Sequence, residues 1–324
     1  MIPWLFDNRQ FFDLGSHSSE QIDVIIPLLH SNHLWEQNLK TYYREIPIGK
    51  LIVGNAGCID GSLEALRNFP RVEILDHRKI ATLGKSLALM IKEVTTAEFA
   101  YLQSDVALPP GWLSRMREDL LKYEWVGSPM HLCVLADYRN DFRTVRPLAG
   151  AQLGKAAAFS GFNEYIDDDF VYRQEDFVLA NFVIEKGFKV GNSSQTYHLH
   201  QFMRRVTTGE ENNIKSINVE VSSSATEMKR VTESQMKGML KYTSPSYELA
   251  KNEVINIVRH TLSSNPKLLI TFLAFAKSDA PQWVPVLKKS AVREWIKVRY
   301  LGTRSLLSAF GFRKIQLLVK IIFS

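Results

Sequence analysis

The chain has 324 residues, of which 45% are hydrophobic and 23% charged, a composition that excludes an intrinsically disordered protein. Its two cysteines exclude a disulfide framework. The net charge of +6 comes from the C-terminal end, because residues 277–324 carry a net +8 and the rest a net −2, which argues against a nucleic-acid-binding protein.

The setting expected from this composition is cytoplasmic. The opening residues lack the pattern of a secretory signal. The longest strongly apolar run, Leu268–Ala276, is far shorter than the roughly 20 residues that cross a bilayer, so no transmembrane helix is predicted.

The first half of the chain alternates strand and helix patterns. Strands are predicted at 22–27, 50–53, 72–75 and 99–102, and helices at 33–43, 62–68 and 83–94. Such alternation predicts an α/β fold with a mostly parallel sheet flanked by helices. Ligands of such sheets bind beyond the carboxyl ends of the strands, here at residues 27–29, 54–60, 76–78 and 103–105.

The second half changes character. Residues 150–169 are small, polar and acidic, and are expected to form loops around a site. A helix is predicted at 176–186 and short strands at 189–190 and 195–200. Three or four helices follow, with breaks near residues 244–245, 265–266 and 281. These patterns predict a catalytic α/β domain over residues 1–205 and a helical region over residues 206–324.

Five segments in the first 205 residues carry a family resemblance. They are residues 24–27 (Val-Ile-Ile-Pro), 52–62, 101–113, 175–177 (Glu-Asp-Phe) and 197–200 (Tyr-His-Leu-His). In this order they resemble the family 2 glycosyltransferases with the GT-A fold. The resemblance implies inverting transfer of a sugar from a nucleotide diphosphate donor (UDP, GDP or dTDP) to a glycan or lipid-linked acceptor, with Mn²⁺ or Mg²⁺.

The resemblance also implies where the donor binds. Asn55 stands where the family has an acidic residue, and Asp60 fits the last acidic position, from which it would bond free N–H groups at a helix start. An ordinary strand–helix turn with an Asp cap is the alternative. Cations near the diphosphate would be Arg78 and Lys85, with Lys79 a weaker candidate. The expected donor-binding set is Pro27, Leu28, Asn55, Asp60, Arg78, Lys85, Gln103 and Ser104.

The metal is expected at Gln103-Ser104-Asp105, where the family usually has Asp-x-Asp. Asp105 supplies the hard carboxylate oxygen that a divalent ion needs, whereas Gln103 brings no charge, so a weaker site is expected. His198 and His200 are further candidate ligands, because residues two apart on a strand face the same side; His198 is favoured. The alternatives are an Asp in a turn and a structural His pair.

The general base is expected at Asp176. Inverting transfer needs a carboxylate that takes the proton of the acceptor hydroxyl, and the family places it at the Asp of the Glu-Asp pair; Glu175 would shape the acceptor site. Carboxylates at a helix start are favoured by the helix dipole without any chemistry, which is the alternative. Asp167, Asp168 and Asp169 compete for the role.

The C-terminal tail, residues 291–323, mixes aromatic and aliphatic residues with Lys and Arg. This pattern is typical of an interfacial helix and predicts a partner in an anionic membrane surface, at the inner face of the cell membrane. A helical domain packed on the catalytic domain or in a dimer explains the pattern equally well.

Other classes of protein fit less well. Asn55, Ala56 and Gln103 favour a degenerate, non-catalytic relative that binds a partner or a membrane. A sugar-phosphate nucleotidyltransferase would carry a Gly-rich basic loop after the first strand, where residues 27–32 read Pro-Leu-Leu-His-Ser-Asn. No G-x-G-x-x-G follows a predicted strand, so a Rossmann dehydrogenase fits less well still.

Overall fold

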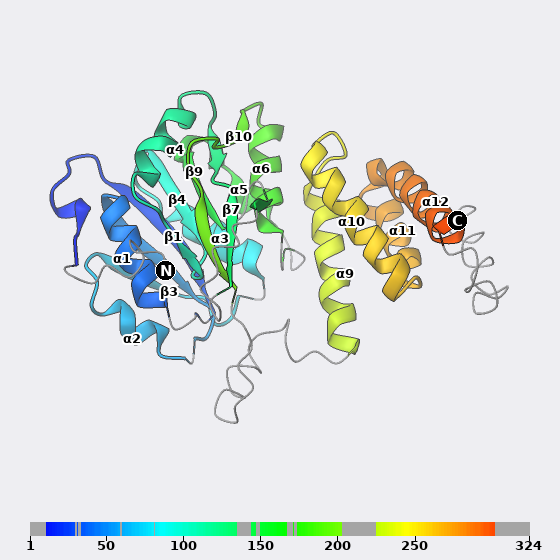
Figure 1. The fold of residues 1–324 in the computed structure, drawn as a ribbon, viewed down its shortest axis with the longest axis horizontal. Coiled ribbons are helices and arrows are strands. Elements are labelled where there is room, and N and C mark those ends of the chain that lie inside the picture. The colour runs from blue at the N-terminus through cyan, green and yellow to red at the C-terminus, as the bar shows by residue number, and fades with distance from the viewer. Residues whose placement is uncertain are drawn as a thin grey trace. The chain divides into compact units, whose positions relative to one another are not determined.

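A computed structural model describes residues 11–29, 31, 34–58, 60–80, 82–134, 144–146, 150–166, 171, 174–202 and 225–301. The chain divides into two compact units, Met1–Asp169 with Phe182–Ser223, and Phe170–Asn181 with Ser224–Ser324. The first unit is α/β and the second is helical (Figure 1). The expected domain boundary near residue 205 lies outside the described residues.

A seven-stranded sheet forms the centre of the first unit. Its strands are β1 (Ile22–Leu28), β2 (Ile48–Asn55), β3 (Val72–Asp76), β4 (Glu98–Leu102), β6 (Trp125–Gly127), β9 (Ala151–Lys155) and β10 (Val190–Asn192). Their order is β10-β6-β9-β4-β1-β2-β3. β9 runs antiparallel to both of its neighbours, and the other pairs are parallel. The predicted mostly parallel sheet is confirmed.

Helices cover both faces of this sheet. Alternate residues of β1, among them Val24 and Ile26, pack in one apolar cluster with α1 (Trp35–Glu45), α2 (Ser62–Leu66) and α4 (Trp112–Leu120). On the other face lie α3 (Leu83–Lys92), α5 (Phe162–Tyr165) and a 3-10 turn, η2 (Ala156–Phe159). There, Phe99 and Trp125 of the sheet contact Phe159. Each such fully buried side chain stabilises the fold by roughly 1.5–3 kcal/mol.

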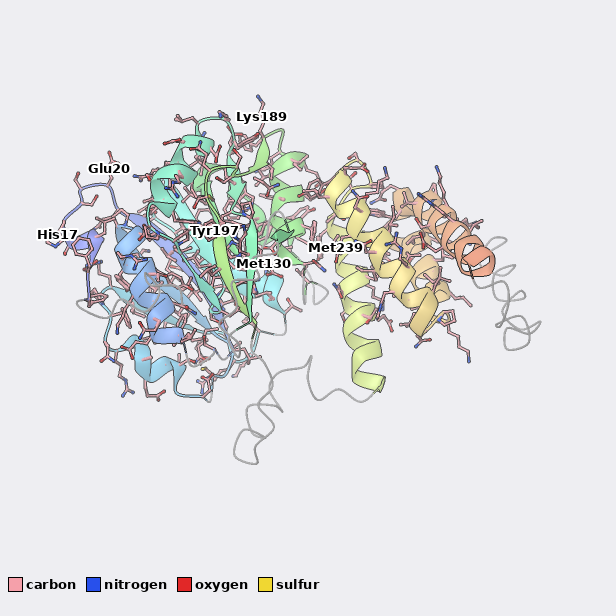
Figure 2. All side chains as sticks on the ribbon, in the orientation of Figure 1. His17, Glu20, Met130, Lys189, Tyr197 and Met239 are labelled. Atoms are coloured by element: carbon pink, nitrogen blue, oxygen red, sulfur yellow. The ribbon has the colours of Figure 1, made fainter. Side chains whose placement is uncertain are left out.

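A second, four-stranded sheet brings distant segments together. It consists of β5 (Val106–Ala107), β7 (Met130–Val134), β8 (Thr144–Arg146) and β11 (His198–Phe202), in the order β5-β11-β7-β8. β11 pairs antiparallel with β5 and parallel with β7, where His198 lies opposite Met130. Met130 and Tyr197, labelled in Figure 2, mark where β7 and β11 begin. β11 therefore lies beside the segment that follows β4.

One expected loop region proves to be regular structure. Residues 150–166, expected to form loops, contain β9 inside the main sheet, followed by η2 and α5. The small residues reflect close packing, because a Cβ on Gly154 would lie 2.0 Å from Cε3 of Trp125. That expectation was wrong, since small residues fit a packed strand as well as a loop.

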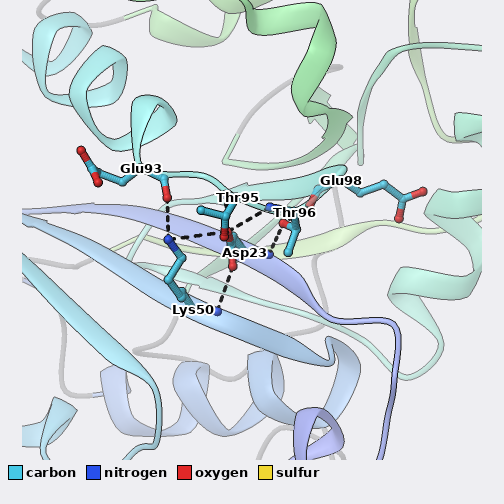
Figure 3. A network of polar contacts seen from close by, with 6 residues as sticks. All are labelled: Asp23, Lys50, Glu93, Thr95, Thr96 and Glu98. Atoms are coloured by element: carbon cyan, nitrogen blue, oxygen red, sulfur yellow. Dashed lines mark hydrogen bonds and ion pairs between the residues drawn. The ribbon is translucent and has the colours of Figure 1, made fainter.

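A buried carboxylate ties strands together at the amino ends of β1 and β2. Asp23 is 1% exposed, and its oxygens accept hydrogen bonds from the backbone N–H groups of Lys50 at 3.0 Å, Thr95 at 2.7 Å and Thr96 at 3.3 Å. Figure 3 shows this network. It secures the edge of the sheet opposite to the carboxyl ends of the strands.

The second unit is built from helices α9 (Ala225–Tyr242), α10 (Glu248–Ser264), α11 (Leu268–Asp279) and α12 (Val284–Leu301), with a 3-10 turn, η4 (Pro281–Trp283). The predicted helices and the breaks between them are confirmed. Met239, labelled in Figure 2, and Trp283 belong to the unit's apolar core. Over the described residues, no helix combines the length and apolarity that a bilayer crossing requires.

One helix belongs to both units. α6 (Glu175–Glu185) begins in the second unit, which extends to Asn181, and continues into the first from Phe182. Phe177 packs in the core of the second unit, and Phe182 contacts Phe162 in the first. Outside the layers described above lies a short 3-10 turn, η1 (Leu14–Ser16).

Candidate functional site

The carboxyl ends of β1 and β2 bring three of the expected donor-binding residues together. Pro27 lies opposite Gly54, and Leu28 lies opposite Asn55. Asn55 in turn lies opposite Asp76, the last residue of β3. Gly54 is a glycine because a Cβ there would approach His77 Nδ1 to 2.7 Å. The edge predicted for ligand binding is therefore formed by adjacent residues.

The turn after β2 is held by its own polar side chains. Asn55 Oδ1 accepts from the N–H groups of Gly57 at 3.0 Å and Cys58 at 2.9 Å. Asp60 accepts from the N–H groups of Ser31 at 2.7 Å and Ser62 at 3.1 Å. Asp60 thus bonds one backbone N–H at the start of α2, that of Ser62, and through Ser31 it ties the loop after β1 to this turn.

The charge of Asp60 is stabilised by its surroundings. Burial raises the pKa of Asp60, but hydrogen bonds from the Cys58 thiol and from the Ser31 and Ser62 N–H groups outweigh burial, so the pKa lies below its ordinary value. Burial and the neighbouring Asp60 carboxylate raise the pKa of Cys58. Cys58 is therefore a protonated hydrogen-bond donor at neutral pH.

The expected cations have different surroundings. Arg78 donates to both oxygens of Asp76, at 2.8 Å and 2.6 Å. Both side chains are mostly exposed, so this pair is weak in water and an anion such as diphosphate can compete for the guanidinium. Lys85 lies at the start of α3, and its Nζ is 3.3 Å from Asn163 Oδ1 and 3.4 Å from the Ile166 carbonyl. Lys79 is exposed.

The segment after β4 leads from the main sheet into the second one. Gln103 donates from Nε2 to the Tyr101 hydroxyl at 3.3 Å, and its backbone N–H donates to Gly150 at 2.8 Å. Ser104 follows Gln103 in the turn, and its carbonyl accepts a hydrogen bond from Asn38 of α1. Asp105 directly precedes β5. Its carboxylate is partly exposed, at 32% of the side chain, as a ligand-binding carboxylate has to be.

Asp105 and His200 lie face to face. The distance from His200 Nε2 to Asp105 Oδ2 is 3.3 Å, and the His200 side chain is 13% exposed. The pairing of β5 with β11 causes this approach, because His200 lies opposite Val106, the residue after Asp105. Two residues 95 positions apart in the chain, both predicted as metal ligands, are thus in contact.

His198 lies deeper than His200. It is fully buried, and its Nδ1 is 2.9 Å from Ser128 Oγ, which itself donates to the Ala151 carbonyl at 3.1 Å. Because the single hydroxyl proton of Ser128 goes to Ala151, His198 Nδ1 is assigned as the donor and Nε2 keeps its lone pair. Burial lowers the pKa of His198 well below its ordinary value, and His200 lowers it further, so the ring is neutral at pH 7.

Gly150 lies against both imidazoles. A Cβ at this position would be 2.9 Å from His200 Nδ1 and 3.1 Å from His198 Nε2. The two rings are 5.9 Å apart between centroids, so the alternation of β11 does turn both toward one point. Sequence reasoning missed this role of Gly150, because the glycine is recognisable only once β11 is placed beside it. Next to His198 in β11, Tyr197 stacks on His131 of β7, with ring centroids 4.3 Å apart.

The residues expected at the general base lie at the start of α6, in the second unit. Glu175 and Asp176 are 4% and 5% exposed. The residue before them, Gln174, has a left-handed backbone with φ of 65°, and its Nε2 donates to Glu253 of α10 at 2.7 Å. Burial raises the pKa of Tyr247 and the charge of Asp176 raises it further, which places Asp176 near this phenol. Asp167, Asp168 and Asp169 lie outside the described residues.

The residues present fit a divalent ion only as a two-ligand site. Among the described residues, no three His, Cys, Asp or Glu side chains are grouped to hold a metal ion. Asp105 and His200 offer a carboxylate oxygen and an imidazole nitrogen at 3.3 Å from each other, donors that suit Mn²⁺ or Mg²⁺ when phosphate oxygens complete the shell. His198 is not grouped with these two residues in a three-ligand cluster; its buried Nε2 lies beside Gly150 and has no hydrogen-bond partner among the described residues.

Comparisons with known proteins give a distant likeness in fold. No protein-family model and no curated protein matches the chain. S. aureus TarS, solved in complex with UDP-GlcNAc, is 12% identical, with 83% of this chain and 80% of that chain covered and a TM-score of 0.47. GalNAc-T7, solved with UDP, GalNAc and Mn²⁺, is 11% identical, with 72% and 54% covered and a TM-score of 0.45.

A third solved structure with a similar fold is a 4-diphosphocytidyl-2C-methyl-D-erythritol synthase from Anaerococcus prevotii. It is 15% identical, with 62% of this chain and 96% of that chain covered and a TM-score of 0.41. At these identities and scores, function has to be inferred from the residues of the site.

Proposed function

We propose that this protein is a metal-assisted glycosyltransferase that moves a sugar from a nucleotide diphosphate donor to a hydroxyl of a glycan or lipid-linked acceptor, with inversion. The observation that carries the proposal is the contact between Asp105 and His200 at 3.3 Å. It lies beyond the carboxyl end of β4, where sheets of this kind bind ligands. Asn55 and Asp60 lie in the turn at the end of β2, at the same edge of the sheet.

The roles of the residues follow from the needs of the reaction. When bound, Mn²⁺ or Mg²⁺ at Asp105 and His200 supplies positive charge to the diphosphate. The acceptor oxygen bonds to the anomeric carbon as the bond from that carbon to the diphosphate breaks. The nucleoside diphosphate leaves with the electron pair, and Asp176 takes the acceptor's proton. Arg78 and Lys85 are the proposed cations for the departing charge.

The activity test is release of nucleoside diphosphate from UDP-, GDP- and dTDP-sugars by the full-length protein with Mn²⁺. Asp176→Asn is expected to slow turnover by about 10²–10⁴-fold, the usual contribution of a general base, while nucleotide binding is kept. Glu185→Gln, at the exposed end of the same helix, is the matched control and should turn over at the rate of the unmodified protein. Equal turnover in Asp176→Asn would remove Asp176 from this role.

A second candidate function is a degenerate relative that binds a partner or a membrane without catalysis. Two observations favour it. Asn55 uses its side-chain oxygen on its own turn, and Gln103, in place of an acidic residue, donates its amide to Tyr101. Nucleotide binding without turnover of any of the three donors would favour this alternative.

A further inference from the structure

Helix α1 holds the segment that carries Asp105. Asn38 Nδ2 donates to the carbonyl of Ser104 at 3.0 Å. The Tyr42 hydroxyl lies 3.0 Å from the carbonyl of Gln103 and 2.7 Å from that of Val106. Asn38 and Tyr42 are one helical turn apart and so share a face of α1, and both are fully buried. Besides packing in the apolar core through the Tyr42 ring, this face of the helix therefore donates hydrogen bonds to the backbone around Asp105.

Two more side chains extend these contacts. Ser31 Oγ, from the loop before α1, also donates to the Ser104 carbonyl, at 3.1 Å. Thr41 Oγ1 accepts from the Leu108 N–H at 3.1 Å. Buried backbone groups have to find partners, and β5, with only two residues, supplies few of them. The path of the chain on both sides of Asp105 is thus set by side chains of α1 and its preceding loop.

Tyr42 has a particular place among them. The two carbonyls that it contacts, those of Gln103 and Val106, flank Asp105 in the chain. Burial raises the pKa of Tyr42 well above its ordinary value, and the charge of Asp105 raises it further. The phenol therefore keeps its proton and remains a donor at neutral pH.

We propose that Tyr42, supported by Asn38 and Ser31, is a positioning residue that keeps Asp105 directed at His200 and thereby sets the affinity of the site for its divalent ion and diphosphate. This inference rests on the proposed function. A ligand site depends on supporting groups that fix its donors within about half an ångström. Loss of the Tyr42 hydroxyl would remove a hydrogen-bond donor from the carbonyls of Gln103 and Val106, on either side of Asp105, while the ring still fills the core.

The test compares Tyr42→Phe with Tyr43→Phe in the full-length protein. Tyr43 is the adjacent residue, is also fully buried, and donates its hydroxyl to the Pro70 carbonyl. The measurement is the Mn²⁺ concentration that gives half of the nucleotide-induced rise in melting temperature. Tyr42→Phe should raise this concentration about fivefold, the equivalent of one hydrogen bond, and Tyr43→Phe should leave it unchanged. A role in folding alone would lower both melting temperatures without moving the Mn²⁺ dependence.

Ser31→Ala is the second variant, since it removes one donor to the Ser104 carbonyl and keeps the Tyr42 core intact. It should raise the same Mn²⁺ concentration about two- to fivefold, and it decides the matter if Tyr42→Phe does not fold. If every variant that folds needs the same Mn²⁺ concentration as the unmodified protein, this inference is overturned and the proposed function still stands. An unmodified protein that shows no Mn²⁺-dependent nucleotide binding overturns both.

Discussion

Gly150 shows how much of the site is decided by one backbone position. Its φ of 73° is in the left-handed region, and the space where a Cβ would lie is bounded by the nitrogens of His198 and His200. Only glycine combines this backbone conformation with so close an approach. The two imidazoles can therefore lie against the chain only because this residue has no side chain.

We predict that Gly150→Ala destabilises the protein more than Gly187→Ala. Gly187 has the same kind of backbone, with φ of 82°, but nothing lies within 4 Å of its Cβ position. Gly187→Ala should cost about 1–2 kcal/mol for the left-handed conformation, and Gly150→Ala a further ~1–3 kcal/mol for the contacts. Urea unfolding monitored by circular dichroism measures both. If both variants lose the same free energy of unfolding, His198 and His200 move aside for the added methyl group without destabilising the protein.

His198 predicts an acid sensitivity. Its pKa is lowered in the folded protein, so below about 6.5 the unfolded chain binds a proton that the folded one does not. The free energy of unfolding should therefore fall as the pH drops from 6.5 towards the lowered pKa, by up to ~1.4 kcal/mol per pH unit.

The measurement for this prediction is urea unfolding at pH 7.5 and 5.5. The difference in free energy of unfolding between the two pH values should shrink by about 1 kcal/mol in His198→Gln. It should be unchanged in His260→Gln, which replaces an exposed histidine of α10. A His198→Gln difference as large as that of the unmodified protein would show that another group causes the acid loss.

At the scale of elements, the sheet is anchored at one edge and open to ligands at the other. Asp23 ties the amino ends of β1 and β2 to the segment before β4, and the turns that carry Asn55 and Asp105 leave from the carboxyl ends. The network at the amino ends of the strands therefore fixes the positions of the strands, while the side chains of the site come from their carboxyl ends.

We predict that Asp23→Ala lowers the free energy of unfolding by about 2–4 kcal/mol, because it removes the buried carboxylate that accepts from the backbone N–H groups of Lys50, Thr95 and Thr96. Lys79→Ala, an exposed position at the other edge, should change it by less than ~0.5 kcal/mol. Nucleotide binding by Asp23→Ala at a temperature where it is folded should match that of the unmodified protein. A specific loss of binding would contradict a purely structural role for the network.

The elements were predictable where periodicity was regular, and not where local sequence was ambiguous. The four strands at 22–27, 50–53, 72–75 and 99–102 are apolar runs and are confirmed as β1–β4. β9 was mistaken for a loop because small residues are also typical of loops. Its Gly154 is small for another reason, since a side chain there would collide with Trp125. β5 has two residues, too few for any pattern. Yet β5 is what brings Asp105 to His200, so this contact could be predicted only from the family resemblance.

At the scale of the whole molecule, charge divides the chain. Residues 277–324 carry ten Lys or Arg and two Asp or Glu, whereas the rest is slightly acidic. The tail, residues 291–323, begins within helix α12, whose Leu287 and Ala291 pack in the apolar core of the second unit. The residues that follow Leu301 lie outside the described residues. The membrane role expected of residues 291–323 remains a prediction.

We predict that the full chain sediments with anionic phosphatidylserine vesicles and that its four cations after Leu301 contribute. These are Arg304, Arg313, Lys314 and Lys320. A full-length variant with all four changed to Gln keeps α12 and the chain length, and should bind these vesicles at least tenfold more weakly, since each cation near the surface contributes ~1 kcal/mol. Neutral phosphatidylcholine vesicles are the control. Equal binding of both proteins would contradict the membrane role.

The central claim is that Asp105 and His200 hold a divalent ion for a nucleotide diphosphate donor. It is tested most directly by the melting temperature of the full-length protein with UDP, GDP or dTDP, with and without Mn²⁺. A ligand of the folded state raises this temperature by mass action. We expect a rise with one nucleotide, only when Mn²⁺ is present, that is lost in Asp105→Asn and kept in Asp279→Asn, which changes an exposed carboxylate at the end of α11. No rise with any nucleotide, or a rise that survives Asp105→Asn, would contradict the claim.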